Sequence, residues 1–137
     1  MGQKTVLVVE DEAAVRSLLS LVLETRDYRV LTAADGQQAL LQIHAEPPDL
    51  VLLDLMLPNV NGWSVMDALE RDARLNQIPV IATSASQSAD GLKERGVRAF
   101  LSKPFDIEGL FRALDDIFAP AQPNDLTAGL NLSLIHI

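Results

Sequence analysis

The sequence predicts an α/β domain with a doubly wound, five-stranded parallel sheet and helices on both faces. Apolar runs typical of strands alternate five times with amphipathic segments at helical spacing. Two of these runs, residues 5–9 and 49–53, are almost continuously apolar, which is typical of parallel strands buried on both faces. The chain has 137 residues, of which 48% are hydrophobic, and this suits one domain around one core.

Each predicted strand leads into a predicted helix. Strands are expected at residues 5–9, 29–32, 49–53, 78–83 and 98–101. Helices are expected at residues 11–24, 35–45, through Val65, Met66 and Leu69, at 89–95, and from Asp106 onward. Right-handed crossovers follow from strand twist, and among doubly wound orders 2-1-3-4-5 best fits five strands of this length.

Proline, glycine and aspartate residues mark the ends of these elements. Pro47 and Pro48 end the second helix, because neither residue can continue it. Gly96 suits the position after the fourth helix, and Asp106 suits the N-cap of the last. The apolar stripe of this last helix comprises Ile107, Leu110, Phe111, Leu114, Ile117 and Phe118.

We assign residues 1–119 to the domain and residues 120–137 to a linker or tail. The tail begins PAQPND and has no helical period, so we expect it to be disordered or derived from a cloning vector. Two organisations stay open at this stage. The domain acts alone through protein contacts, or it belongs to a longer protein.

Composition excludes several classes of function. The chain has no cysteine, which rules out disulfides, a thiol nucleophile and a cysteine zinc site, and suits a reducing cytoplasm. No run approaches the roughly 20 apolar residues of a membrane span, and the start does not resemble a signal peptide. The formal net charge of −8 argues against direct contact with nucleic acid or an anionic membrane. Two interpretations of the charge stay open: it holds a divalent cation or meets a partner with a basic face, or it only keeps the chain soluble.

Side chains that can bind a metal ion or take part in a reaction follow four of the predicted strands. Glu10 and Asp11 follow the first strand, Asp54 the third, Ser84 the fourth and Lys103 the fifth. Because ligands of such sheets bind at the carboxyl ends of the strands, we expect these side chains to converge there. Crowded carboxylates repel each other, and Mg²⁺ relieves this repulsion while keeping waters that phosphate oxygens can replace. A carboxylate can also take a phosphoryl group, with the metal and a lysine neutralising the charge that develops.

Four stretches resemble the signature sequences of the response-regulator receiver family of two-component signalling. They are VLVVEDE, LVLLDLMLPNVNG, PVIATSA and AFLSKPF, which occur in order within roughly residues 4–119. The resemblance implies a flavodoxin-like fold. It further implies that Asp54 is the phosphoacceptor, that Asp11 binds Mg²⁺ directly, that Glu10 binds it through water, and that Met56 offers its backbone carbonyl.

The resemblance also implies a set of switch residues. The Ser84 hydroxyl would turn toward the phosphoryl group, and Lys103 would pair with a phosphate oxygen. The peptide bond between Lys103 and Pro104 would be cis. Phe100 occupies the aromatic switch position, where tyrosine is frequent, and phenylalanine lacks the hydroxyl that would form a hydrogen bond. The stretch between Ser84 and Phe100 is about one helical turn short for the family.

We therefore expect a cytoplasmic signalling switch that assists only its own phosphorylation and dephosphorylation and is otherwise not an enzyme. A sensor histidine kinase or a phosphotransfer protein would be the donor. A downstream protein would bind the face formed by the fourth helix, fifth strand and fifth helix, and the chain would be a monomer or weak dimer. One alternative is a pseudo-receiver that binds partners without being phosphorylated. A haloacid-dehalogenase-type hydrolase is disfavoured, because Met56 stands where that family needs a second acid.

Met56 and Ser86 fall at positions that resemble those tuning dephosphorylation, and neither side chain can act as an acid or base near neutral pH. We predict a phosphoryl group that lasts longer than in the fast chemotaxis regulators. Its decay in purified protein with Mg²⁺ measures this directly. Loss within seconds would contradict the prediction.

Overall fold

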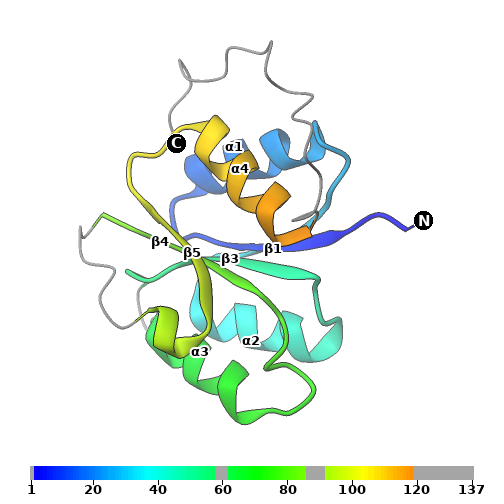
Figure 1. Cartoon of the computed structure of the whole chain (residues 1–137), viewed down its shortest axis with the longest axis vertical. Helices are drawn as coiled ribbons and strands as arrows, with labels where there is room; N and C mark the ends of the chain where they lie inside the picture. Colours follow the sequence, from blue (N-terminus) through cyan, green and yellow to red (C-terminus); the bar gives the residue numbers. More distant parts are fainter. Residues whose placement is uncertain (1, 58–61, 86–91, 119–137) are drawn as a thin grey trace.

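The computed structural model describes residues 2–57, 62–85 and 92–118. Its five strands form one parallel sheet in the order β2-β1-β3-β4-β5, which confirms the predicted fold class and strand order. Helices lie on both faces, with α1 and α4 above the sheet and α2 and α3 below it in Figure 1. The predicted tail, residues 120–137, lies outside the described residues.

Strands and helices alternate along the chain, as the apolar periodicity predicts. The elements are β1 (Thr5–Val9), α1 (Ala13–Glu24), β2 (Arg29–Ala33), α2 (Gly36–Ala45), β3 (Leu50–Asp54), α3 (Gly62–Arg71), β4 (Val80–Ser84), the 3₁₀ turn η1 (Lys93–Arg95), β5 (Val97–Ser102) and α4 (Ile107–Phe118). Most boundaries lie within two residues of those predicted.

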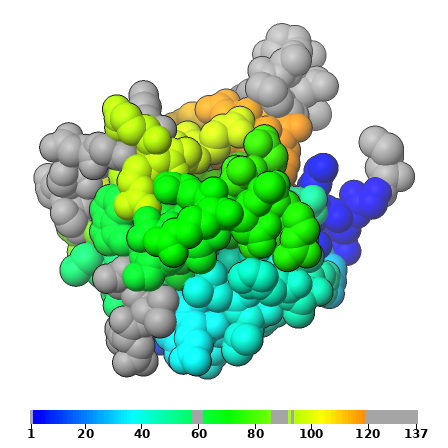
Figure 2. Space-filling model, turned by 90° about the horizontal axis from the view of Figure 1, so that it is seen from below, coloured from blue at the N-terminus to red at the C-terminus, as the bar shows by residue number. Residues whose placement is uncertain are grey.

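Two hydrophobic layers fix the sheet between the helices. Every residue of β3 and β4 is buried, because these central strands face helices on both sides. Alternate strand residues pack against the helices of each face, such as Leu53 with α2 and α3, and Leu52 with α1 and α4. From below, Figure 2 shows α2 and α3 as a continuous layer over the sheet. The strand ends are thereby held in fixed register.

The last helix forms as the sequence predicts. The Asp106 side chain accepts a hydrogen bond of 2.7 Å from the backbone N–H of Gly109, which is an N-cap. Four residues of the predicted apolar stripe are fully buried, namely Ile107, Leu110, Phe111 and Leu114. This cap fixes where α4 begins, directly after the loop that carries Lys103.

The predicted fourth helix, residues 89–95, requires a correction. Its described part is the single 3₁₀ turn η1, while residues 86–91 lie outside the described residues. Gly96 follows with a φ of +85°, a conformation that favours glycine and turns the chain directly into β5. The helix labelled α4 therefore corresponds to the predicted fifth helix.

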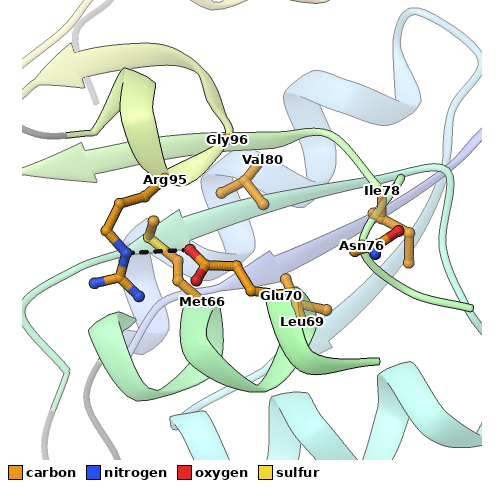
Figure 3. A pocket seen from close by; sticks show the side chains of 8 residues that line it. All are labelled: Met66, Leu69, Glu70, Asn76, Ile78, Val80, Arg95 and Gly96. Atoms are coloured by element: carbon orange, nitrogen blue, oxygen red, sulfur yellow. Dashed lines mark hydrogen bonds and ion pairs between the residues drawn. The ribbon is translucent and has the colours of Figure 1, made fainter. Parts of the chain in front are cut away.

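Side-chain contacts tie η1 to α3. The Arg95 guanidinium forms ion pairs with Asp67 and with Glu70, the latter at 3.1 Å, and lies 5.3 Å from the ring centre of Trp63. Beside this contact is a hollow of about 30 Å³ between α3 and β4, with Arg95 and Glu70 at its rim (Figure 3). Such a volume holds little more than one water molecule.

Gly62 lets α3 approach the end of β3. A Cβ atom at this position would lie 2.6 Å from Leu55 Cα and 2.8 Å from the Asp54 carbonyl oxygen, and both of these are rigid backbone atoms. We expect Gly62→Ala to lower the free energy of unfolding by about 1–3 kcal/mol through overpacking.

Urea unfolding measures this effect. Gly2→Ala is the matched control, because a Cβ atom there would meet nothing within 4 Å. Equal stability of the two variants would contradict the close approach.

Candidate functional site

Three carboxylates meet where the central strands end. Glu10 and Asp11 follow β1, and Asp54 is the last residue of β3. Because β1 and β3 are paired in parallel, with Val9 opposite Leu53, the residues that follow this pair come together. One oxygen from each carboxylate can be chosen so that all three lie within 4.8 Å of one another. The predicted convergence of these acids is therefore present.

Lys103 joins two of these carboxylates. Its Nζ donates a hydrogen bond of 2.7 Å to Glu10 Oε1 and one of 3.0 Å to Asp54 Oδ2. The Lys103 backbone N–H donates to the carbonyl oxygen of Ser84 at 2.8 Å, which extends the pairing of β4 with β5. The peptide bond between Lys103 and Pro104 is cis, as the resemblance implies.

Backbone N–H groups hold the remaining carboxylate oxygens. Glu12 N–H donates to Glu10 Oε2 at 3.2 Å, and Met56 N–H donates to Asp54 Oδ1 at 2.9 Å. Each of the two buried carboxylates thus has a partner on both oxygens. This arrangement fixes their orientation, as expected of buried charges that must be paired.

Burial differs among the three acids. Glu10 and Asp54 are only 1% and 4% exposed, whereas Asp11 is exposed. Burial raises the pKa of Glu10, although hydrogen bonds from Lys103 and from Glu12 N–H oppose this shift. For Lys103, burial acts to lower the pKa, but hydrogen bonds to Glu10 and Asp54 outweigh it and raise the pKa. The buried part of the site therefore holds a charged lysine.

The donor set fits a hard divalent cation. Three carboxylates against one ammonium leave the site with a formal deficit of positive charge, and carboxylate oxygens are ligands that Mg²⁺ prefers. The exposed Asp11 lies on the solvent side of the cluster, where a cation could keep part of its water shell.

The other predicted site residues occupy different surroundings. Ser84 is 2% exposed at the end of β4, and Phe100 is partly buried against the core cluster on the α2–α3 face. Met56 is 65% exposed and lies two residues beyond Asp54. Ser86, predicted to tune dephosphorylation, lies outside the described residues.

Arg16 contacts the acidic loop, and the sequence alone did not predict this contact. Its Nη1 donates to the backbone carbonyl oxygen of Glu10 at 2.8 Å and lies 3.4 Å from that of Asp11. The sequence feature that could have indicated this contact is the presence of an arginine near the start of a helix, where the macrodipole favours acidic side chains over basic ones.

Glu10 supplies a pH test of the site in metal-free buffer. Because its pKa is raised in the folded protein, its contribution to stability is full below the usual pKa of a glutamate and is lost as pH rises through the raised value. The stability of Glu10→Gln relative to the native chain should therefore increase between about pH 4 and pH 7.

Urea unfolding across this range measures the difference. Glu46→Gln is the control. Because Arg29 lowers the pKa of Glu46, the contribution of Glu46 to stability changes only below the usual pKa of a glutamate, so the relative stability of this variant should stay nearly flat over most of the same range. A relative stability of Glu10→Gln that stays flat or falls with pH would contradict the prediction.

Among the described residues, no helix combines the length and apolar character needed to cross a bilayer.

Comparison with known proteins identifies relatives of this fold and site. The family model described as the response regulator receiver domain matches residues 6–115. The phosphate regulon transcriptional regulatory protein PhoB of Pseudomonas aeruginosa is 35% identical over 136 residues, which cover 96% of this chain and 59% of PhoB. Protein PilH of the same organism is 33% identical over 117 residues, which cover 83% of this chain and 97% of PilH.

Solved structures agree with this assignment. The chemotaxis response regulator CheY4 of Vibrio cholerae is 27% identical with a TM-score of 0.79, over 85% of this chain and all of CheY4. The chain spans about half the length of PhoB and of the RpaA and ycf27 regulators that it also matches. By family model, sequence and structure, the chain belongs to the response regulator receiver domain family.

Proposed function

We propose that this receiver domain is a phosphorylation-dependent signalling switch in which Asp54 accepts a phosphoryl group with Mg²⁺ bound beside it. The observation that carries the proposal is the convergence of Glu10, Asp11 and Asp54 within 4.8 Å, with Lys103 bonded to two of them. Membership of the receiver family supports the same role.

Hydrogen bonds fix the orientation of the Asp54 carboxylate, which is the proposed nucleophile. One of its oxygens accepts a hydrogen bond from Met56 N–H and the other from Lys103. In the proposed step an Asp54 oxygen attacks phosphorus, a new O–P bond forms, and the bond from phosphorus to the donor's histidine nitrogen breaks. The Lys103 ammonium lies next to the attacked group and neutralises charge on its equatorial oxygens.

The acids suit a Mg²⁺ site in which Asp11 and Asp54 bind directly, Glu10 acts through water and Met56 offers its carbonyl oxygen. A bound cation would neutralise phosphate charge together with Lys103. This division into direct and indirect ligands is the one that the family resemblance implies, because Lys103 and a backbone N–H group contact Glu10 and Asp54 alike.

Ser84 and Phe100 are the proposed switch. Ser84 is buried at the end of β4, next to β3 and Asp54, and Phe100 lies on the paired strand β5. A phosphoryl group on Asp54 draws the Ser84 hydroxyl toward it, and Phe100 changes its packing against the core. Because the phenylalanine side chain forms no hydrogen bond, Phe100 takes part in this switch by packing alone.

The proposed donor is a sensor histidine kinase or a phosphotransfer protein, and the proposed setting is the cytoplasm. The output passes to a protein partner on the face of η1, β5 and α4 rather than to DNA directly, because the net charge of −8 opposes contact with phosphates. Within the described residues, this face has a 3₁₀ turn, η1, at a place where the resemblance implies a helix. That difference is also what favours the second candidate, a pseudo-receiver that is not phosphorylated.

Asp54→Asn separates these candidates. We expect a small phosphodonor to modify the native chain in the presence of Mg²⁺, and the modification to be lost in Asp54→Asn or on addition of EDTA. Intact mass spectrometry measures the phosphoryl group, and beryllofluoride with Mg²⁺ provides a stable analogue.

Asp116→Asn, on the exposed side of α4, is the matched control and should be modified like the native chain. A native chain that remains unmodified would support the pseudo-receiver. Sustained turnover of a phosphate ester would indicate a hydrolase.

A further inference from the structure

The Asp11 carboxylate depends on its backbone for its position. It is exposed, and within the described part of the chain it has no hydrogen-bond partner of its own. Glu10 and Asp54, in contrast, are buried and held on both oxygens. A cation bound by this cluster would therefore rely on whatever fixes the loop between β1 and α1.

Arg16 fixes that loop. Its guanidinium Nη1 donates to the Glu10 carbonyl oxygen at 2.8 Å and lies 3.4 Å from the Asp11 carbonyl oxygen. On the other side of the loop, Glu10 N–H donates to the Ala33 carbonyl oxygen on β2 at 3.1 Å. The peptide units on both sides of the Asp11 Cα are thus the ones that Arg16 contacts.

Helix stability does not explain an arginine at this position. Arg16 lies four residues into α1 from its N-cap, near the positive end of the macrodipole, where a cation is unfavourable. The N-cap residue, Glu12, makes no side-chain capping hydrogen bond, so the start of α1 has no local cap for Arg16 to support. Its contacts run back to the acidic loop instead.

We propose that Arg16 is a positioning residue for the cation site, which holds Asp11 in place through the backbone carbonyls of Glu10 and Asp11. This inference rests on the proposed function, because it assumes that the acidic cluster binds Mg²⁺. Two effects of Arg16 oppose each other. Its positive charge repels a cation, whereas its hydrogen bonds pre-organise a ligand.

Positioning outweighs repulsion in this geometry. The guanidinium is bound to carbonyl oxygens on the backbone of the loop, and it is only partly buried, so solvent screens its charge. Loss of an outer-shell partner weakens metal binding by about 10- to 100-fold in well-studied sites. We expect the lower end of this range, because Asp11 is one ligand of several.

The test is a Mg²⁺ titration at constant ionic strength, followed by the amide NMR signals of Glu12 and Met56. Arg16→Met removes the hydrogen bonds and the charge at similar side-chain length and should raise the Kd for Mg²⁺ by about tenfold. Arg16→Lys keeps the positive charge but replaces the planar guanidinium with a compact ammonium group. Its Kd for Mg²⁺ should lie between those of the native chain and of Arg16→Met. Arg74→Met is the matched control and should leave the Kd unchanged. Arg74 is exposed and lies between α3 and β4, at the amino-terminal end of the strands, whereas the acidic cluster lies at their carboxyl-terminal end.

The outcomes separate the inference from the proposed function. Urea unfolding and the NMR spectrum establish that each variant is folded. A raised Kd for Mg²⁺ in a variant whose amide signals are as well dispersed as those of the native chain would therefore support the positioning role of Arg16. An unchanged or lower Kd in Arg16→Met, with normal binding by the native chain, would overturn the role of Arg16 alone. A native chain that binds no Mg²⁺ would overturn the proposed function and this inference together.

Discussion

The ion pair of Lys103 with Glu10 and Asp54 is the constraint on which the rest of the site depends. Two carboxylates that are 1% and 4% exposed lie side by side, and burial of such charges is unfavourable unless they are paired. Lys103 provides that pairing from the residue directly after β5, a strand that lies two positions away from β3 in the sheet. A misplaced β5 would therefore leave both acids without their shared partner.

The sheet order explains how distant segments reach one point. The strands β1 and β3 are neighbours at its centre and deliver the acids, while β4 and β5 follow in sequence and deliver Ser84 and Lys103. The backbone hydrogen bond from Lys103 to the Ser84 carbonyl oxygen ties the last two strands together just beyond their ends. Asp54 is consequently linked through Lys103 to the end of β5, and β5 packs against α4.

That surface differs from the one expected from the sequence. In the part of the chain that the structure describes, η1 is a single turn, and Arg95 fastens it to α3 through Asp67 and Glu70. The same arginine lies over Trp63, next to Gly62, whose close approach to the Asp54 carbonyl oxygen sets the position of α3. Through Arg95, Trp63 and Gly62, η1 is thus connected to the backbone at Asp54 by contacts that do not include Phe100.

The sequence by itself determined the fold class and the identity of the converging side chains, because buried parallel strands have continuous apolar runs and because the carboxyl ends of such strands lie at one end of the sheet. The observed strand order was the best fit among known doubly wound sheets, since apolar runs alone do not fix which strands are neighbours. The N-cap at Asp106 was also predictable, since its effect is local. Only the tertiary structure decided that Lys103 binds both Glu10 and Asp54, that Arg16 reaches back to the acidic loop, and that η1 is held by α3. These are contacts between individual polar side chains on segments that tertiary packing brings together, and such contacts leave no periodic pattern in the sequence.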